Sequence, residues 1–282
     1  MSKKNRIEQD SIGKIAVSNE DFWGAQTQRS LKNFKIGNHI MPIEIIRALA
    51  IIKLSCAKVN SKQKILSNKL SAAIVGASKL VLSGKYDRHF PLSVWQTGSG
   101  TQTNMNVNEV IANLANKKLT GKLGTNSPVH PNDHVNKSQS TNDSFPSAIN
   151  IATAILVKDS LIPSMKRLQT TLKSHSKKWD KIIKVGRTHL QDATPLSLGQ
   201  EFSGYEAMIS SNIKRVEQSF NSLLNLAQGG TAVGSGLNTK KNFDKFVVNE
   251  ISKISKIKFK PAINKFQALA AHDAIVEMSG SL

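Results

Sequence analysis

Apolar residues recur every three or four positions along most of this 282-residue chain, which is the spacing of amphipathic helices. Three sets each predict one helix face: Ile45, Leu49, Ile52, Cys56 and Val59; Val107, Val110, Ile111 and Leu114; and Phe145, Ile149, Ala152 and Leu156. The start of the chain differs. The short alternation of Ile12–Val17 around Gly13 predicts a small hairpin or an extended arm.

The longest apolar stripe begins after Pro195. Ser197 and Gln200 have capping-box spacing, which predicts a helix N-terminus here. The stripe that follows comprises Phe202, Tyr205, Ile209, Ile213, Val216, Phe220 and Leu224. Helices of this length without short-range partners are typical of bundles. We therefore predict a mainly α fold, a long-helix bundle with a small mixed N-terminal domain. The expected domains are residues 1–137 and 138–282.

The cysteine content and the N-terminus limit the class of protein. Cys56 is the only cysteine, so an internal disulfide and a thiolate metal cage are excluded, and its apolar neighbours predict a buried helix residue. Residues 1–13 mix basic and acidic side chains and contain no apolar core of a signal peptide. The apolar runs are shorter than a membrane span. A cytoplasmic protein without a membrane segment is expected.

The charge balance is strongly basic, with 39 Lys and Arg against 19 Asp and Glu and a formal net charge of +20. This balance raises the possibility of nucleic-acid binding. The lysines are spread along the chain, however, and the densest stretch, Lys253–Lys265, is interleaved with apolar residues. Aromatic residues make up only 5% of the chain. Solvated surface is the favoured interpretation, and the positive field would also attract small anions.

Two polar segments precede predicted helices. In Trp95–Glu109, two glycines, the hydroxyls of Ser99 and Thr101, free backbone N–H groups and a helix N-terminus are compatible with a carboxylate cradle. Taken alone, the segment favours a polar loop with an N-cap. In Val129–Asp143, His130 and His134 flank a Pro-Asn turn, which disfavours helical metal-ligand geometry. The amides and hydroxyls around them suit an anion better than a metal.

Two further segments contain a histidine and a glycine cluster. His189 lies in the polar segment Val185–Pro195, and histidine is well matched to proton transfer near neutral pH, although a lone histidine is more often structural. Residues 228–236 include four glycines, which permit tight turns and close backbone approach. A simple interhelical loop is the alternative for this segment.

Together and in this order, the four segments resemble the fumarase/aspartase superfamily from about Arg6 to Leu282. The strings Trp95–Thr101 and His130–Asp133 are most similar to class II, iron-free fumarases. Aspartases tend to carry an alanine between the two glycines and an asparagine in place of His130, whereas the Thr188-His189 pair also occurs in some of them.

The resemblance implies a hydro-lyase that interconverts fumarate and L-malate in the tricarboxylic acid cycle, without a cofactor or a metal, as a homotetramer with shared active sites. His189 would be the catalytic acid and base. The implied substrate-binding residues are Ser99, Gly100, Thr101, Ser140, Thr141, Asn142 and Thr188. A second anion site would comprise His130, Pro131, Asn132 and Asp133.

The sequence departs from the family pattern in two places. The family's catalytic loop, with a serine base and a Met-Pro-x-Lys-x-Asn signature, does not follow Gly236. We therefore expect the N-terminal portion of a fumarase, truncated before the C-terminal domain and inactive alone. Ser127 stands where many relatives carry a basic residue, which weakens the case for the second anion site.

Two alternative functions stay open. One is an aspartate ammonia-lyase of the same superfamily, which activity on aspartate instead of malate would identify. The other is a non-catalytic basic helical protein, which steeply salt-dependent DNA binding would support.

Overall fold

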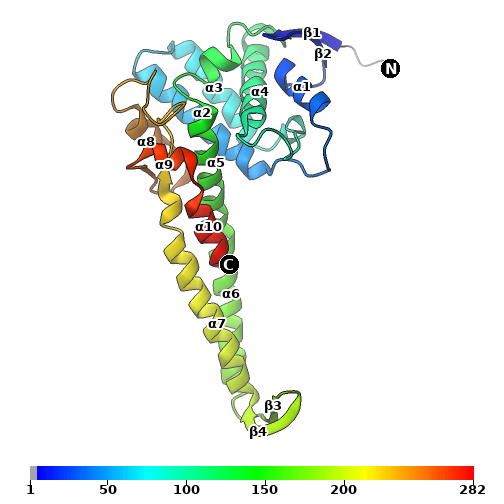
Figure 1. Ribbon diagram of the computed structural model, residues 1–282, viewed down its shortest axis with the longest axis vertical. Helices are drawn as coiled ribbons and strands as arrows, with labels where there is room; N and C mark the ends of the chain where they lie inside the picture. Colours follow the sequence, from blue (N-terminus) through cyan, green and yellow to red (C-terminus); the bar gives the residue numbers. More distant parts are fainter. Residues whose placement is uncertain (1–4) are drawn as a thin grey trace. The chain divides into compact units, whose positions relative to one another are not determined.

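The computed structural model describes residues 5–282, and the packing of the chain defines two compact units. The first unit comprises the residues up to Ala152 together with Leu224–His272, and the second comprises Thr153–Leu223 and Asp273–Leu282 (Figure 1). The domain boundary at residue 137 stays a prediction.

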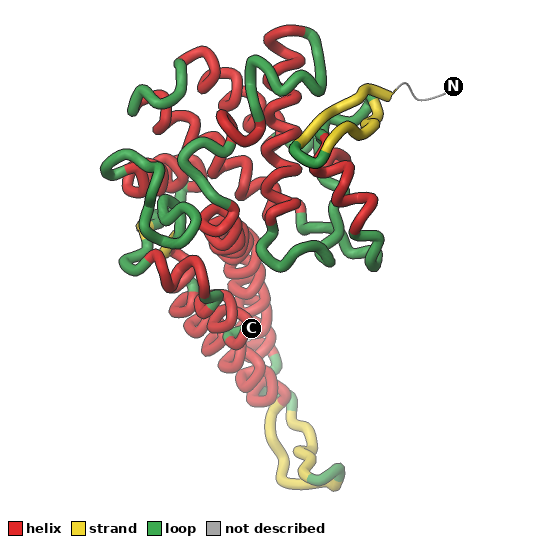
Figure 2. Tube along the Cα trace, turned by 45° about the horizontal axis from the view of Figure 1, so that its top comes forward, coloured by secondary structure: helices red, strands yellow, loops and turns green. Residues whose placement is uncertain are grey.

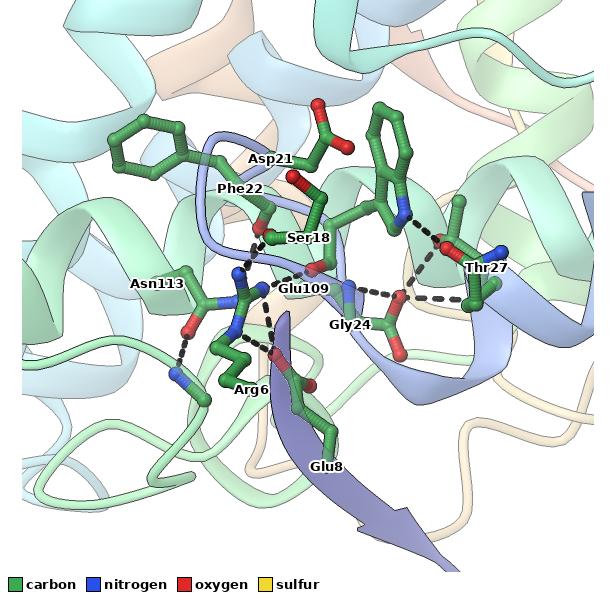
Figure 3. Close-up of polar contacts among 12 residues, drawn as sticks. Arg6, Glu8, Ser18, Asp21, Phe22, Gly24, Thr27, Glu109 and Asn113 are labelled. Atoms are coloured by element: carbon green, nitrogen blue, oxygen red, sulfur yellow. Dashed lines mark hydrogen bonds and ion pairs between the residues drawn. The ribbon is translucent and has the colours of Figure 1, made fainter. Parts of the chain in front are cut away.

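The first unit begins with the expected hairpin. Strands β1 (Asn5–Asp10) and β2 (Gly13–Ser18) pair antiparallel and lead into helix α1 (Ala25–Asn33). Helix α1 has glycine as its N-cap, so no side chain of its own caps it. The buried carboxylate of Glu109 takes this role: it accepts hydrogen bonds from the backbone N–H groups of Gly24 at 2.9 Å and Thr27 at 3.1 Å (Figure 3). A carboxylate at a helix N-terminus is favoured by the helix dipole, so Glu109 fastens the N-terminal arm to the helical core.

Helices form the body of the first unit (Figure 2). They are α2 (Ile43–Lys62), α3 (Asn68–Leu82), α4 (Thr101–Thr120), α8 (Phe243–Ser255), α9 (Lys265–Ala270) and, up to Ala152, α5 (Thr141–Leu156). Two short strands, β5 (Asn225–Leu226) and β6 (Lys260–Pro261), pair in parallel. Helix α2 packs against α3, α4 and α8, and it is buried on most of its circumference, Cys56 included. The predicted faces on α2 and α4 are confirmed, apart from the half-buried Ile45.

The second unit contains two long helices, α6 (Ile162–Lys178) and α7 (Leu198–Ser219), joined by an antiparallel hairpin of β3 (Ile183–Thr188) and β4 (Gln191–Ser197). Helix α10 (Asp273–Gly280) packs against α7. The predicted capping box is confirmed, because Ser197 Oγ accepts from the Gln200 N–H and the Gln200 side chain accepts from the Ser197 N–H.

Several sequence predictions about these helices are wrong in detail. Helix α5 begins at Thr141, and Pro146 lies inside it. Its buried residues centre on Ala148 and Ile151, whereas Leu156 is exposed. Small side chains permit close packing, and the larger apolar residues therefore do not define the buried face. Helix α7 ends at Ser219, and only two members of its long stripe, Ile213 and Val216, are buried within it.

One helical stretch, Thr141–Lys178, is long and apolar enough to cross a membrane by length and composition, and 39% of its most apolar window is buried. A core helix passes the same test. The apolar residues Ala148 and Ile151 in the first part of this stretch are fully buried. Packing in the protein interior therefore accounts for the apolar composition of this part.

Candidate active site

A cleft of about 900 Å³ in the first unit is lined mainly by hydroxyl and amide side chains. Its walls come from the start of α4, from the segment leading into α5 and from the glycine-rich segment. The lining includes Thr101, Asn104, Ser140, Thr141, Asn142, Thr231 and Ser235. Three of the four polar segments found in the sequence therefore meet at one place.

The start of α4 forms one wall. Gly100 is its N-cap, with a φ of 73° that is unfavourable for residues with a side chain. The hydroxyls of Ser99 and Thr101 are 2.8 Å apart and exposed. The N–H of Gly100 donates to the carbonyl of Thr97, so this N–H already has an acceptor within the protein. The two hydroxyls hydrogen-bond to each other, so one of their two hydrogens stays free to donate to a carboxylate.

The start of α5 forms the facing wall. The hydroxyl of Thr141 accepts a hydrogen bond from Asn104 Nδ2 on α4 at 2.9 Å. Asn142 Nδ2 donates to the carbonyl of Ala232 at 2.7 Å, and its backbone N–H donates to Ser140 Oγ at 3.2 Å. These contacts join α4, α5 and the glycine-rich segment around the cleft.

Asp143 holds the glycine-rich segment in place, a role that the sequence analysis missed. Its buried carboxylate accepts from the backbone N–H groups of Gly229 at 3.0 Å and Thr231 at 2.9 Å, and from that of Ser140 at 3.1 Å. Burial is the larger effect and raises the pKa of Asp143 to about 6, while these hydrogen bonds act to lower it. The carboxylate thus stabilises two walls of the cleft from behind.

Lys53 was also missed. Its side chain is fully buried in α2, and Nζ donates to Asn136 Oδ1 at 2.8 Å and to Gln139 Oε1 at 3.0 Å. Burial lowers the pKa of Lys53 to about 8. The available signal was a single lysine between Ile52 and Leu54 within an apolar helical run, because lysine is rarely buried without a specific partner.

The predicted second anion site lies around a one-turn π-helix, Pro131–Val135. The ring nitrogen Nδ1 of His130 accepts from the backbone N–H groups of Asn132 at 3.2 Å and Asp133 at 3.1 Å, so these donors are already used. Asn132 and Asp133 also line the large cleft.

His130 itself lines a separate cleft of about 350 Å³, together with the carboxylates of Glu8, Asp10 and Glu109. Glu8 pairs with Arg6 at 2.7 Å, and burial raises the pKa of both Glu8 and Glu109 (Figure 3). The three carboxylates in its walls already have partners: Glu8 pairs with Arg6, Asp10 pairs with Arg29 at 2.7 Å, and Glu109 accepts from the N-terminus of α1. Ionised carboxylates have no donor to offer an anion. Anion binding at His130 stays a prediction, and residues 5–282 contain no cluster of His, Cys, Asp and Glu suited to a metal.

Thr188 and His189 lie in the second unit. Thr188 ends β3 and pairs with Gln191, so His189 and Leu190 form a two-residue turn. Both turn residues have positive φ, 52° and 63°, as in type I′ turns. The sequence analysis did not predict this hairpin, because neither turn residue is a glycine and the strands are too exposed to alternate clearly. The imidazole of His189 is exposed at the turn, and its catalytic role stays a prediction.

The sequence matches the family described as Lyase over residues 13–282. The chain belongs to this lyase family. It is 56% identical over 280 residues to the class II fumarate hydratase of Rickettsia conorii, a match that covers 99% of this chain and 60% of the relative. It is 53% identical over 284 residues to the mitochondrial fumarate hydratase of Saccharomyces cerevisiae, covering 100% of this chain and 58% of that relative.

The fold comparison agrees with the lyase assignment. A crystal structure of recombinant class II fumarase from Schistosoma mansoni matches with a TM-score of 0.95 and 43% identity, over 99% of this chain and 62% of that one. The predicted family and the mainly helical fold class are therefore confirmed. The chain spans about 60% of the length of the relatives it matches.

Proposed function

We propose that this lyase chain supplies one part of a class II fumarate hydratase, which reversibly hydrates fumarate to L-malate. The observation that carries the proposal is the cleft where Thr101, Ser140, Thr141 and Asn142 converge. Hydroxyl and amide donors at fixed positions suit the oxygens of a dicarboxylate, which accept hydrogen bonds and do not donate them. The relatives named fumarate hydratase support this choice of reaction.

The proposed chemistry needs a proton donor and acceptor and a stabilised carbanion. Ser99, Thr101, Ser140, Thr141, Asn142 and Thr188 bind the substrate carboxylates, and Gly100 leaves room for them. His189 exchanges a proton, through water, at the hydroxyl-bearing carbon of malate. Removal of the C3 proton gives a carbanion whose charge spreads onto the adjacent carboxylate. The proton passes to a base, and because malate is already a dianion the carbanion carries a third negative charge. Electrostatic stabilisation of this added charge is the largest contribution to such a step.

The assembly and location follow from the same proposal. The complete enzyme is a homotetramer whose active sites draw on more than one subunit, and it acts in the tricarboxylic acid cycle in the cytoplasm. No cofactor is needed, because the proton transfers use side chains and water. The net charge of +20 also attracts a dianionic substrate over distances beyond direct contact.

The test is the ultraviolet absorbance of fumarate, followed in both directions with the full-length protein and with residues 1–282 alone. We expect the full-length protein to interconvert fumarate and malate and to leave aspartate unchanged. Residues 1–282 alone should show no turnover, because no Met-Pro-x-Lys-x-Asn signature follows Gly236 among these residues. Ammonia release from aspartate would identify the aspartase alternative, and inactivity on both substrates would refute the proposal.

A further inference from the structure

Lys53 is a buried cation whose two hydrogen-bond partners are neutral amides. The side chain is 0% exposed, and Nζ contacts the oxygens of Asn136 and Gln139. Burial disfavours the protonated form of Lys53, while Cys56 on α2 and then Asp143 on α5 act to favour it. Lys53 does not line the large cleft, yet both of its partners do.

An ammonium group has donors only, so it dictates the orientation of every amide in contact with it. Asn136 must turn its oxygen to Lys53, and this same oxygen then accepts from Asn104 Nδ2 at 3.3 Å. The Asn104 amide group also donates to Thr141 Oγ1 at 2.9 Å. Since the Thr141 oxygen receives a donor from behind, its own hydrogen is left to donate elsewhere, and Thr141 lines the cleft.

The second partner orders the adjacent backbone. Gln139 Oε1 accepts from Lys53, which turns Gln139 Nε2 toward the carbonyls of Val135 and Lys137, each at 3.1 Å. The segment that leads into Ser140 and Thr141 is therefore held by the same ammonium group.

We propose that Lys53 is a positioning residue for the carboxylate-binding wall, which acts through Asn136 and Asn104 to make Thr141 a hydrogen-bond donor toward the cleft. The inference rests on the proposed function in one respect, namely that the cleft binds a dicarboxylate. Lys53 itself touches neither the substrate nor the reacting atoms.

A purely structural role would have a different signature. Lys53→Met removes a buried charge with its desolvation cost, but it also leaves the oxygens of Asn136 and Gln139 without their donor, so the two effects on stability oppose each other. The variant should therefore stay folded while it loses the orientation of Asn136, Asn104 and Thr141. Loss of succinate affinity in a variant that stays folded separates positioning from folding.

The experiment compares the full-length parent, Lys53→Met and the matched control Lys58→Met, which removes a partly exposed lysine from the same helix. The probe is succinate, an unreactive dicarboxylate, and its affinity is measured by calorimetry beside thermal unfolding and fumarate turnover. For Lys53→Met we expect affinity to fall by roughly tenfold to a hundredfold, the scale of misplaced binding groups. KM should rise more than kcat falls, and the variant should still unfold in one cooperative thermal transition. Lys58→Met should match the parent in affinity.

Succinate affinity of Lys53→Met within twofold of the parent would overturn the inference. If Lys53→Met does not fold, Lys53→Gln replaces it. A glutamine amide can present either its oxygen or its NH₂ group, so it does not fix the orientation of Asn136, and the same loss of affinity is expected. Failure of both variants to fold would assign Lys53 to stability and also overturn the inference. A parent that binds succinate but does not hydrate fumarate would refute the proposed function while leaving the role of Lys53 testable by affinity.

Discussion

The ring of Phe145 on α5 lies where a side chain at residue 100 would stand. A Cβ built on Gly100 comes within 2.5 Å of three ring atoms of Phe145, which real Cβ atoms do not tolerate. Gly100 also has a φ of 73°. Glycine is therefore required at position 100 for two reasons: the positive φ of the backbone and the close approach of α5 to the start of α4.

Gly100→Ala should consequently be damaging. We expect a loss of roughly 1–3 kcal/mol in unfolding free energy, from the strained φ and the displaced ring, and a large loss of succinate affinity. Gly98→Ala is the matched control, because no atom lies within 4 Å of its added Cβ and its φ is not positive. Urea unfolding measures both variants, and equal stabilities for the two would contradict this explanation.

Asp143→Asn should loosen the glycine-rich segment. One carboxylate oxygen accepts from Gly229 and Thr231, and the other accepts from Ser140. Whichever way an amide is turned, its NH₂ group faces N–H donors, so we expect a loss of about 2–4 kcal/mol.

The control for Asp143→Asn is Asp159→Asn, at an exposed position, which should change stability by less than about 0.5 kcal/mol. Hydrogen exchange should locate the added mobility of Asp143→Asn in residues 228–236. Unchanged protection of those amides would show that Asp143 does not anchor them.

The sequence predicted the helices and the polar segments better than it predicted their supports. Hydrophobic periodicity indicates which helices exist, and the capping box at Ser197 located one helix start correctly. Lys53 and Asp143 escaped notice because their importance depends on partners distant in sequence, such as Asn136 and Gly229. Periodicity also cannot tell which face of α5 is buried when alanines and serines form that face.

Lys53 should give folding stability a measurable pH dependence. Burial lowers its pKa from 10.5 to about 8, so between these values the unfolded chain binds a proton that the folded chain does not. Stability must then rise with pH across this window, with a slope of up to about 1.4 kcal/mol per unit. Lys53→Met lacks this contribution.

The difference in unfolding free energy between the parent and Lys53→Met isolates the pH dependence due to Lys53, because Cys56 is present in both proteins. Chemical unfolding at pH 7.5 and pH 10 provides the four values. The stability of the parent relative to Lys53→Met should increase as the pH rises. Parallel pH profiles of stability would mean that the pKa of Lys53 is not lowered in the folded state.

The second unit should cause self-association. Helix α6 has no buried residue, and α7 and α10 expose large apolar side chains, with Met208 58% and Val276 70% exposed. Apolar surface of this kind marks an interface with other protein. Light scattering at increasing concentration should therefore show oligomers, and Met208→Lys should shift the distribution toward smaller species. Ser211→Lys, at an exposed polar position of the same helix, is the control. A stable monomer at all concentrations would contradict this expectation and the proposed tetramer.

His189 and His130 can be compared by the same substitution, because asparagine suits the backbone at both positions. His189 has a φ of 52°, a conformation that asparagine tolerates well. His130 accepts backbone N–H groups at the start of a π-helix, and asparagine is a good acceptor at such positions. Neither variant should change the melting temperature appreciably.

Their effects on turnover in the full-length protein should differ. His189→Asn removes the proposed acid and base, so kcat should fall roughly a hundredfold or more. His130→Asn should stay close to the parent, because His130 faces a cleft that already contains Glu8, Asp10 and Glu109. Steady-state rates with malate as the substrate test which of the two histidines is needed for turnover. Near-normal turnover of both variants would refute the role of His189, and failure of the His130 variant alone would exchange the two assignments.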